Sequence, residues 1–433
     1  MSLPRFNFTD RGRPFVELGT GDTRTDLGVA RWDVAHWNNP ADATWSGSEP
    51  LWVDQTCHGY TIELANGRQR NTDTFAPATA TVTLDNSSGW ADATLLTMRP
   101  GRQLRVGIDH TVYGRVVLFR GIVDAVAQTY TPELGDSVEV SAMCALGEVG
   151  RVNLAEIAAP GVGTGEGAHL RVIRILDRAK WPAGKRDVAE SGVACLATRF
   201  GQQVADMFAI VAESTGGAVY GDTEGRVVFR GRDWQMFYPA DPVDATIGNG
   251  GGDTVCPSEY QLAHRRDDLV TQVVIGRQDV DVEPFTFDDV PGQQMYGLEV
   301  FQATDLVCST SGQLTTIKNR MFRVRGGATS TQRVERVLLD AATSAGAVDV
   351  ATTVSPFDPV SRIRCRLILS RGVVFDAQLL VTGVRHSMTP DEWTCDVDLD
   401  NAAPFQTAAA RWDDNNGWDL STWAVSALER VGT

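Results

Sequence analysis

The sequence has seven cysteines but no CxxC pair. An odd and widely spaced set predicts neither a disulfide framework nor a zinc site, because both need cysteines at paired positions. We therefore expect most of these side chains to be small hydrophobic residues of a core. They stand singly at Cys57, Cys144, Cys195, Cys256, Cys308, Cys365 and Cys395.

Long apolar runs are also missing. No uninterrupted stretch approaches the roughly 20 residues that span a bilayer. The opening MSLPRFNFTDRGRPF lacks the apolar centre of a signal peptide. The sequence therefore predicts no membrane insertion and a protein that is made in a cytosol.

Positive charge is scarce, and lysine most of all. The formal net charge is -16 at pH 7, and lysine occurs only at Lys180, Lys185 and Lys318. Nucleic acids and anionic membranes bind clustered lysine and arginine, which displace their counterions. The charge therefore speaks against specific binding of either partner, while it suits a surface past which nucleic acid slides without sticking.

Motifs for catalysis and for metal binding are absent as well. None of the six histidines has HExxH or HxH spacing, and no GxSxG pentapeptide occurs. The glycine-rich segment 161–167 lacks the Gly-Lys-Ser/Thr of a phosphate loop, and segment 413–419 lacks the register of a calcium loop. Adjacent acids such as Asp267 and Asp268 are typical of solvated turns. We expect a protein that is not an enzyme and has no metal or other cofactor.

One pattern does occur twice. Residues 115–146 read as a strand, a glycine at Gly121, a second strand, a Thr-Pro turn and a third strand. Residues 372–400 repeat this order, with Gly383 in the place of Gly121. In both copies the last strand alternates apolar and polar residues, which places one face on a core and the other in water. The repeat predicts two related β domains in a β-rich α+β protein.

Between the two copies the pattern becomes helical. One predicted helix has Val172, Ile175, Leu176 and Ala179 on one face, and a second has Val204, Met207, Phe208 and Val211, with Gly216-Gly217 at its end. A hairpin, AVYGDTEGRVVFRG, follows, and a later helix is predicted with Ser311 as its cap. We predict an N-terminal arm with the first β domain at 1–152, an inserted α/β domain at 153–246, the second β domain at 247–404 and a C-terminal tail at 405–433.

Tryptophans gather near both ends of the chain. Four lie close together at Trp32, Trp37, Trp45 and Trp52, and the tail carries three more. Such side chains either seal a corner of their own domain or anchor a partner, and both interpretations stay open. The candidates for a partner interface are Trp32, Trp37, Trp412, Trp418 and Trp423.

Four segments carry a resemblance to a known family. They are RWDVAHWNNPADATWSG, then ATVTLDNSSGW with MRPGRQLRVGI and VVLFRGIVD, then the helix pair leading to YGDTEGRVVFRGR, and finally VTGVRHSMTPDEWTCDVDLDNA. Their arrangement, more than their identity, resembles the minor tail proteins of long-tailed phages of GC-rich bacteria, in particular the baseplate or tail-tip hub. The resemblance covers most of the chain.

The resemblance implies a structural protein of the virion, at the tail tip, made in the host cytoplasm. Hubs of this kind look like two tube-forming, β-barrel-like domains separated by an α/β insertion. Three copies form a homotrimeric ring that surrounds the DNA passage and joins the tail tube to the receptor-binding apparatus. The implied partners are the distal tail or tail tube protein, the tape measure protein and other minor tail or fibre proteins. Some longer members carry a peptidase or sugar-binding module after this region, so host-wall degradation is not implied.

Two other functions stay open. In a carbohydrate-binding module for host recognition, the tryptophans would stack on sugar rings of a cell-wall polymer. A cell-wall hydrolase without a recognisable motif is a third possibility.

The net charge adds an expectation about the DNA passage. A channel that lets a polyanion pass should offer few cations, so we expect an acidic wall. The candidates are the polar residues of the last alternating strand, Asp396, Asp398 and Asp400, whose neighbours Val397 and Leu399 face the other way. The alternative is that these acids lie on the outside.

Overall fold

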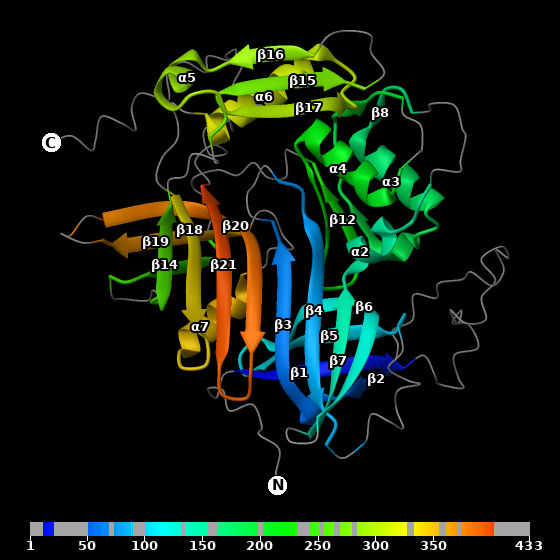
Figure 1. Ribbon diagram of the computed structural model, residues 1–433, viewed down its shortest axis with the longest axis vertical. Helices are drawn as coiled ribbons and strands as arrows, with labels where there is room; N and C mark the ends of the chain where they lie inside the picture. The colour runs from blue at the N-terminus through cyan, green and yellow to red at the C-terminus, as the bar shows by residue number, and fades with distance from the viewer. Residues whose placement is uncertain are drawn as a thin grey trace.

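The computed structural model describes residues 12–20, 51–68, 73–87, 89, 100–131, 135–154, 163–197, 202–231, 243–250, 255–263, 269–278, 284–326, 333–354, 361–369, 372 and 374–401. Most of its strands belong to one 13-stranded sheet (Figure 1). The first half of the chain supplies β1 (Gly12–Thr20), β2 (Leu51–Asp54), β3 (Gly59–Gly67), β4 (Ala76–Asp85), β5 (Gln103–His110), β6 (Gly114–Thr131) and β7 (Gly135–Met143). The second half supplies β13 (Ala245–Gly248), β14 (Glu259–Ala263), β18 (Arg333–Asp340), β19 (Arg362–Ile368), β20 (Val374–Met388) and β21 (Trp393–Asn401).

The two halves of the sheet repeat one strand order. The first half runs β3-β4-β7-β6-β5 and the second runs β14-β18-β21-β20-β19. Antiparallel pairing of β20 with β3 joins the halves edge to edge. The sheet is therefore continuous across both copies of the pattern that the sequence repeats.

A bulge in each half shows which residues are equivalent. The β6–β7 register shifts between Val123 and Ala125, and the β20–β21 register shifts between Val381 and Gly383. Gly383 is thus equivalent to Ala125, and the sequence match of Gly383 with Gly121 was wrong by four residues. Gly121 is a glycine for a different reason, which is the close approach of the backbone: a Cβ there would lie 2.3 Å from the Met143 carbonyl oxygen.

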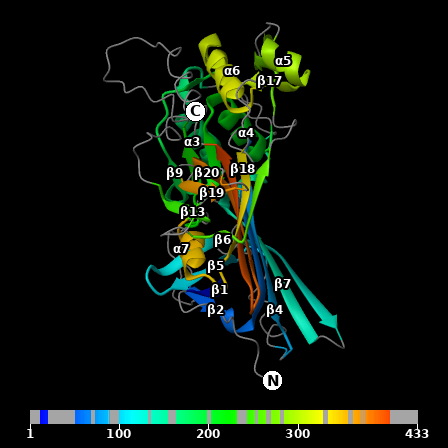
Figure 2. The same ribbon diagram turned by 90° about the vertical axis from the view of Figure 1, so that its left-hand side faces the viewer.

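The long strands β6 and β20 fold the sheet over on itself. The first part of each pairs with β5 or β19, and the second part pairs with β7 or β21. As a result β5, β1 and β2, and likewise β19 and β13, cross behind the upright front strands (Figure 2). The core fills the space between these layers, with Val16, Val106, Ile62 and Val82 all 0 % exposed. Helix α7 (Ala345–Thr353) adds Val348 to the same core.

A small α/β unit follows the first half. It contains α2 (Ala145–Gly150), β8 (Glu166–Gly167), α3 (Ala168–Arg178), β9 (Arg186–Val188), β10 (Ala194–Cys195), α4 (Val204–Thr215), β11 (Ala218–Gly221) and β12 (Val227–Arg230). A 3-10 turn at Ala183–Lys185 lies within this unit, and another at Thr56–His58 lies between β2 and β3. Both predicted helices and the hairpin are confirmed. Val172 and Ile175 of α3 are fully buried, and Gly216 ends α4 in the left-handed region with φ of 68°.

Residues 269–326 form a further compact part, which we call the outer module. Its three strands are β15 (Gln272–Arg277), β16 (Phe285–Asp288) and β17 (Val300–Leu306), and its helices are α5 (Val290–Tyr296) and α6 (Ser311–Arg325). It has a core separate from that of the large sheet, including Val273, Ile275 and Leu314. The N-cap of α6 is Thr310, whose backbone amide donates to Gln313 Oε1 at 3.2 Å. The predicted cap Ser311 is therefore the first residue of the helix.

The α/β unit and the outer module both lie at one end of the large sheet, the upper end in Figure 1. The β20–β21 turn lies at the opposite end. The predicted β-rich α+β class is confirmed, while the domain limits at 152, 246 and 404 stay a prediction. No helix in the described part of the chain is long and apolar enough to cross a membrane.

Candidate functional site

The front face of the large sheet is polar, as the alternation in β21 predicts. Val397 and Leu399 are 0 % exposed and point into the core. Asp396 and Asp398 point to the other face, where strands β18, β20, β3 and β4 add further polar side chains. This polar front face is the candidate functional surface.

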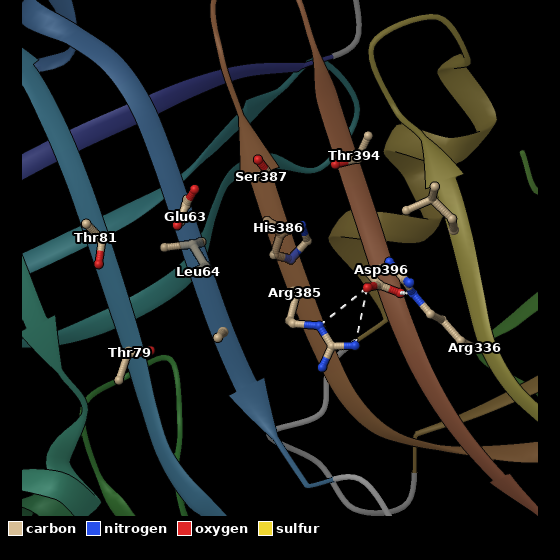
Figure 3. A pocket seen from close by; sticks show the side chains of 12 residues that line it. Glu63, Leu64, Thr79, Thr81, Arg336, Arg385, His386, Ser387, Thr394 and Asp396 are labelled. Carbon is tan, nitrogen blue, oxygen red and sulfur yellow. Dashed lines mark hydrogen bonds and ion pairs between the residues drawn. The ribbon is translucent and has the colours of Figure 1, made fainter. Parts of the chain in front are cut away.

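Two arginines hold the acids of this face in place. Arg385 on β20 donates two hydrogen bonds of 2.8 Å to Asp398, one to each carboxylate oxygen, and two of 3.2 and 3.4 Å to one oxygen of Asp396. Arg336 on β18 donates to the second carboxylate oxygen of Asp396 from the other side (Figure 3). Paired N–H donors from one guanidinium fix a carboxylate in position as well as in charge. The three strands are thus linked across the polar face by an alternating row of charges.

The electrostatics of this row follow from its partial burial. Burial raises the pKa of Asp398, and Arg385 works against that rise. Burial also opposes the charge of Arg385, but Asp398 and Asp396 outweigh it and raise the pKa of the guanidinium. Each charge is therefore compensated by an opposite charge at hydrogen-bond distance.

The row borders a shallow depression of about 340 Å³ on the front face. Thr79, Thr81, Glu63 and Ser387 line its other parts (Figure 3). The nearby His386 is 7 % exposed, and burial lowers its pKa to about 4. Its Nδ1 accepts a hydrogen bond of 3.4 Å from Trp393 Nε1. The depression offers hydroxyls and paired charges, which suit contact with water or another polar surface.

Asp400, the third predicted acid of the wall, has a different environment. It is 6 % exposed and is the last residue but one of β21. Burial and, to a smaller extent, the positive charge of Arg320 lower the pKa of Arg68 to about 9, while the negative charge of Asp400 opposes this shift. Asp400 therefore stabilises a buried arginine.

The five tryptophans predicted as interface candidates, at positions 32, 37, 412, 418 and 423, lie outside the described residues. Three other tryptophans are described. Trp181 is 5 % exposed and Trp393 is 0 % exposed. The guanidinium groups of Arg105 and Arg120 lie over the ring of Trp52, at 4.2 and 5.3 Å from its centre. The rings of Trp181 and Trp393 are therefore buried, while Trp52 is half-buried with two guanidinium groups over its ring.

Within the described ranges, one His–Asp contact joins the two halves. His110 Nε2 lies 3.0 Å from Asp349 on α7, and His110 Nδ1 accepts the backbone amides of Val112 and Tyr113. In the described part of the chain, no group of three His, Cys, Asp or Glu side chains could hold a metal ion.

No pattern in the sequence indicates the two edges of the front sheet. β14 pairs with β18 on one side, and β6 beyond Ile122 pairs with β7 on one side. No strand in the described ranges pairs with the other edge of either segment. In contrast, the equivalent edges of β20 and β3 pair with each other, with Ser387 opposite Glu63 and Met388 opposite Ile62. The two outer edges, on β6 and β14, are therefore equivalent to the two edges of β20 and β3 that already pair in the middle of the sheet.

Comparison with known proteins shows likeness at the level of structure. No protein-family model matches the sequence, and no curated protein matches it. The structure is similar to the tail protein from Neisseria meningitidis MC58, with a TM-score of 0.53 over 81 % of this chain and 94 % of that one. It is also similar to the 43 kDa tail protein of prophage MuSo2 from Shewanella oneidensis, with a TM-score of 0.53 over 82 % and 96 %. The chain has a tail-protein fold. The identities of 14 % and 9 % limit this conclusion to the fold.

The tail-protein fold confirms the resemblance that the order of sequence segments indicates. The likeness spans nearly the whole length of both tail proteins and about four fifths of this chain. Because fold alone does not give function, the role of the chain must be argued from its surfaces.

Proposed function

We propose that this chain is a structural hub protein of a phage tail tip, and that three copies form a closed ring around the DNA passage. The observation that carries the proposal is the edge pairing of β20 with β3. It joins two equivalent halves within one chain, and the same pairing can be repeated between chains. In that arrangement the second part of β6 in one copy pairs with β14 of the next.

The equivalent residues define the register of this joint. Ala125 is equivalent to Gly383, so Thr129 is equivalent to Ser387. Gln261 pairs with Arg336 as Glu63 pairs with Thr81, so Gln261 is equivalent to Glu63. Since Ser387 lies opposite Glu63, Thr129 of one copy is expected opposite Gln261 of the next. Thr129 and Gln261 are both exposed.

A closed ring would also pair the two strand edges that no strand of the described ranges pairs with. Exposed strand edges are sites of uncontrolled pairing, and closed symmetry leaves none. Three chains with two equivalent halves each would present six similar units to a sixfold tail tube. The number three comes from the resemblance to hub proteins, and the edge-to-edge joint from the strand order.

In this ring the polar front face lines the passage, because the opposite face is occupied by the core. The wall would carry Asp396 and Asp398 paired with Arg385 and Arg336, together with the exposed acids Glu63 and Glu139. Compensated charges with a surplus of acid offer DNA no cluster of free cations, so a polyanion would pass without binding. The proposed partners remain the tail tube or distal tail protein, the tape measure protein and other minor tail or fibre proteins.

Engineered cross-linking tests the joint. In a Cys256→Ser background, we expect the double variant Thr129→Cys, Gln261→Cys to form disulfides between copies under mild oxidation. The products on a denaturing gel should be covalent dimers and trimers. The matched control is Gln128→Cys with Gln261→Cys, because neighbouring residues of a strand point to opposite faces. This control should stay monomeric on the same gel.

Mass photometry of the unmodified chain gives the second measurement. A trimer with cross-linking of the first pair alone supports the ring and its register. A trimer in which neither pair reacts would contradict the β6–β14 joint. A monomer or a twofold dimer as the assembled form in tail tips would contradict the ring itself.

A further inference from the structure

A short seam connects the α/β unit to the outer module. Cys195 at the end of β10 lies opposite Cys308, which follows β17, in an isolated antiparallel bridge. Two backbone hydrogen bonds flank the pair: Leu196 N donates to Val307 O at 2.8 Å, and Ser309 N donates to Ala194 O at 3.4 Å. The two cysteines therefore occupy a non-hydrogen-bonded position of an antiparallel pair.

This position brings two side chains close together. Residues directly opposite at such a site have Cα atoms about 4.5 Å apart, and their side chains leave on the same face. A disulfide needs a Cα separation of roughly 4.4–6.8 Å. The backbone of the seam therefore meets the main geometric condition for a bond between the two sulfur atoms.

Other contacts hold the seam in register. Ser214 at the end of α4 accepts a hydrogen bond from the Val307 amide at 2.8 Å, through its Oγ, and its carbonyl oxygen lies 3.3 Å from Cys308 Sγ. Gln313 of α6 donates to the Ala194 carbonyl oxygen at 3.0 Å. The opposition of the two cysteines is thus fixed by elements on both sides of the seam.

Both thiols are protected. Cys195 is 0 % exposed and Cys308 is 1 % exposed, and both are free thiols. Burial raises the pKa of Cys195 to about 11 and that of Cys308 to about 12. Because the thiolate is the reactive form, the pair should stay reduced in a reducing cytosol and react slowly elsewhere.

We propose that Cys195 and Cys308 form a disulfide that staples the outer module to the α/β unit once the protein meets an oxidising environment. The oxidant is a small-molecule disulfide. One cysteine thiolate attacks it and releases the first small thiol, and the second cysteine then displaces the other. The chain loses two protons and one electron pair, and the oxidant is reduced to two thiols.

The staple joins segments that are more than a hundred residues apart in sequence, which fixes how the outer module sits on the α/β unit. Cross-linking distant residues restricts the unfolded chain most. Disulfides persist on virion surfaces, unlike in the cytosol. The bond itself is independent of the proposed ring. Only its timing, after release of the virion from the host, rests on the proposed function.

The test is peptide mapping of the full chain after incubation with oxidised glutathione, at a urea concentration below the unfolding transition so that the seam opens transiently. We expect a peptide pair linked through Cys195 and Cys308, which dithiothreitol separates. Cys365 is the control within the same molecule, because it is also 0 % exposed but lies opposite Ala377. It should remain a free thiol.

A thermal scan adds a functional readout. Oxidation should raise the unfolding midpoint of the wild type and leave that of Cys195→Ser unchanged, and reduction should reverse the rise. The peptide map needs no variant, so the proposal stays testable even if Cys195→Ser folds poorly. Linkage of either cysteine to a different partner, or two free thiols after oxidation, would overturn the proposal, whether or not the chain forms trimers.

Discussion

Replacing Arg385 by glutamine tests the row of charges on the front face. The change removes four hydrogen bonds to carboxylates and leaves Asp398, whose side chain is 14 % exposed, without this guanidinium. A hydrogen bond to a charged group contributes about 1.5–3 kcal/mol when buried. The Arg385 side chain is 45 % exposed, so solvent screens part of this. We expect Arg385→Gln to lower the free energy of unfolding by about 1–2 kcal/mol at pH 8.

The loss of unfolding free energy in Arg385→Gln should depend on pH in a definite direction. Burial raises the pKa of Asp398, and the variant lacks the arginine that opposes this rise. An acid with a higher pKa in the folded state binds more protons when folded, so its contribution to stability falls as the pH rises through that pKa. The deficit of the variant should therefore be largest at pH 8 and should shrink on acidification. Urea unfolding followed by tryptophan fluorescence, between pH 8 and pH 5.5, measures it above the isoelectric point of about 4.8.

Arg364→Gln is the matched control. Arg364 also donates two hydrogen bonds to one carboxylate, that of Asp376, at 2.9 and 2.8 Å. This pair lies in solvent, where such bridges contribute little, so we expect no measurable change. Equal effects of the two variants would refute the argument from burial. So would an Arg385→Gln effect that is undiminished in an Asp398→Asn background.

Three further predictions address the core, the β3–β20 junction between the two halves, and the tail. Trp393→Ala should cost about 3–5 kcal/mol of unfolding free energy in the same urea assay, because this side chain is 0 % exposed; a cost below that of Arg385→Gln would contradict its place in the core. Gly67→Ala should disrupt the β3–β20 junction and lower the thermal midpoint, since the new Cβ would lie 2.3 Å from the Thr382 carbonyl oxygen, with φ of +112°. Gly114→Ala, with φ of +72° and no atom within 4 Å, should lower it less, and equal shifts would show that crowding has no effect. Alanine at all three tail tryptophans should leave the mass of the assembled ring unchanged but lower the yield of complete tail tips, and normal assembly would show that they anchor no partner. These positions are Trp412, Trp418 and Trp423.

Local patterns in the sequence predicted local structure well. The period of two in β21 placed Val397 and Leu399 in the core, and the helical period placed Val172 and Ile175 on the buried face of α3. Such patterns depend only on neighbouring residues, so they can be read without knowing the fold. The α6 cap was wrong by one position because Thr310 and Ser311 are both good capping residues, and the side chain of Gln313 decides between them.

Long-range pairing could not be predicted in the same way. Alternation in the sequence predicted that Asp396 and Asp398 lie on the polar face, but not their partners Arg336 and Arg385, because the neighbours of β21 are known only once the strand order is known. The joint of β20 with β3 brings together residues about 320 positions apart, such as Ser387 and Glu63. The opposition of Cys195 and Cys308 was hidden for the same reason. Each depends on register between distant segments, which single-sequence periodicity does not contain.

The placement of the α/β unit and the outer module gives the proposed ring a direction. Both lie at the same end of the large sheet, and the opposite end carries the β20–β21 turn (Figure 1). A ring of such chains would have two unlike rims. The first rim would carry the α/β units and the outer modules, and the second rim the β20–β21 turns. Among the described residues, no further unit lies over the ends of the front strands at the second rim, so a flat neighbour could meet them there. Stacking would therefore have one direction. We expect a tube to extend directly from the second rim, while the first rim binds components that contact the α/β units and the outer modules from the side.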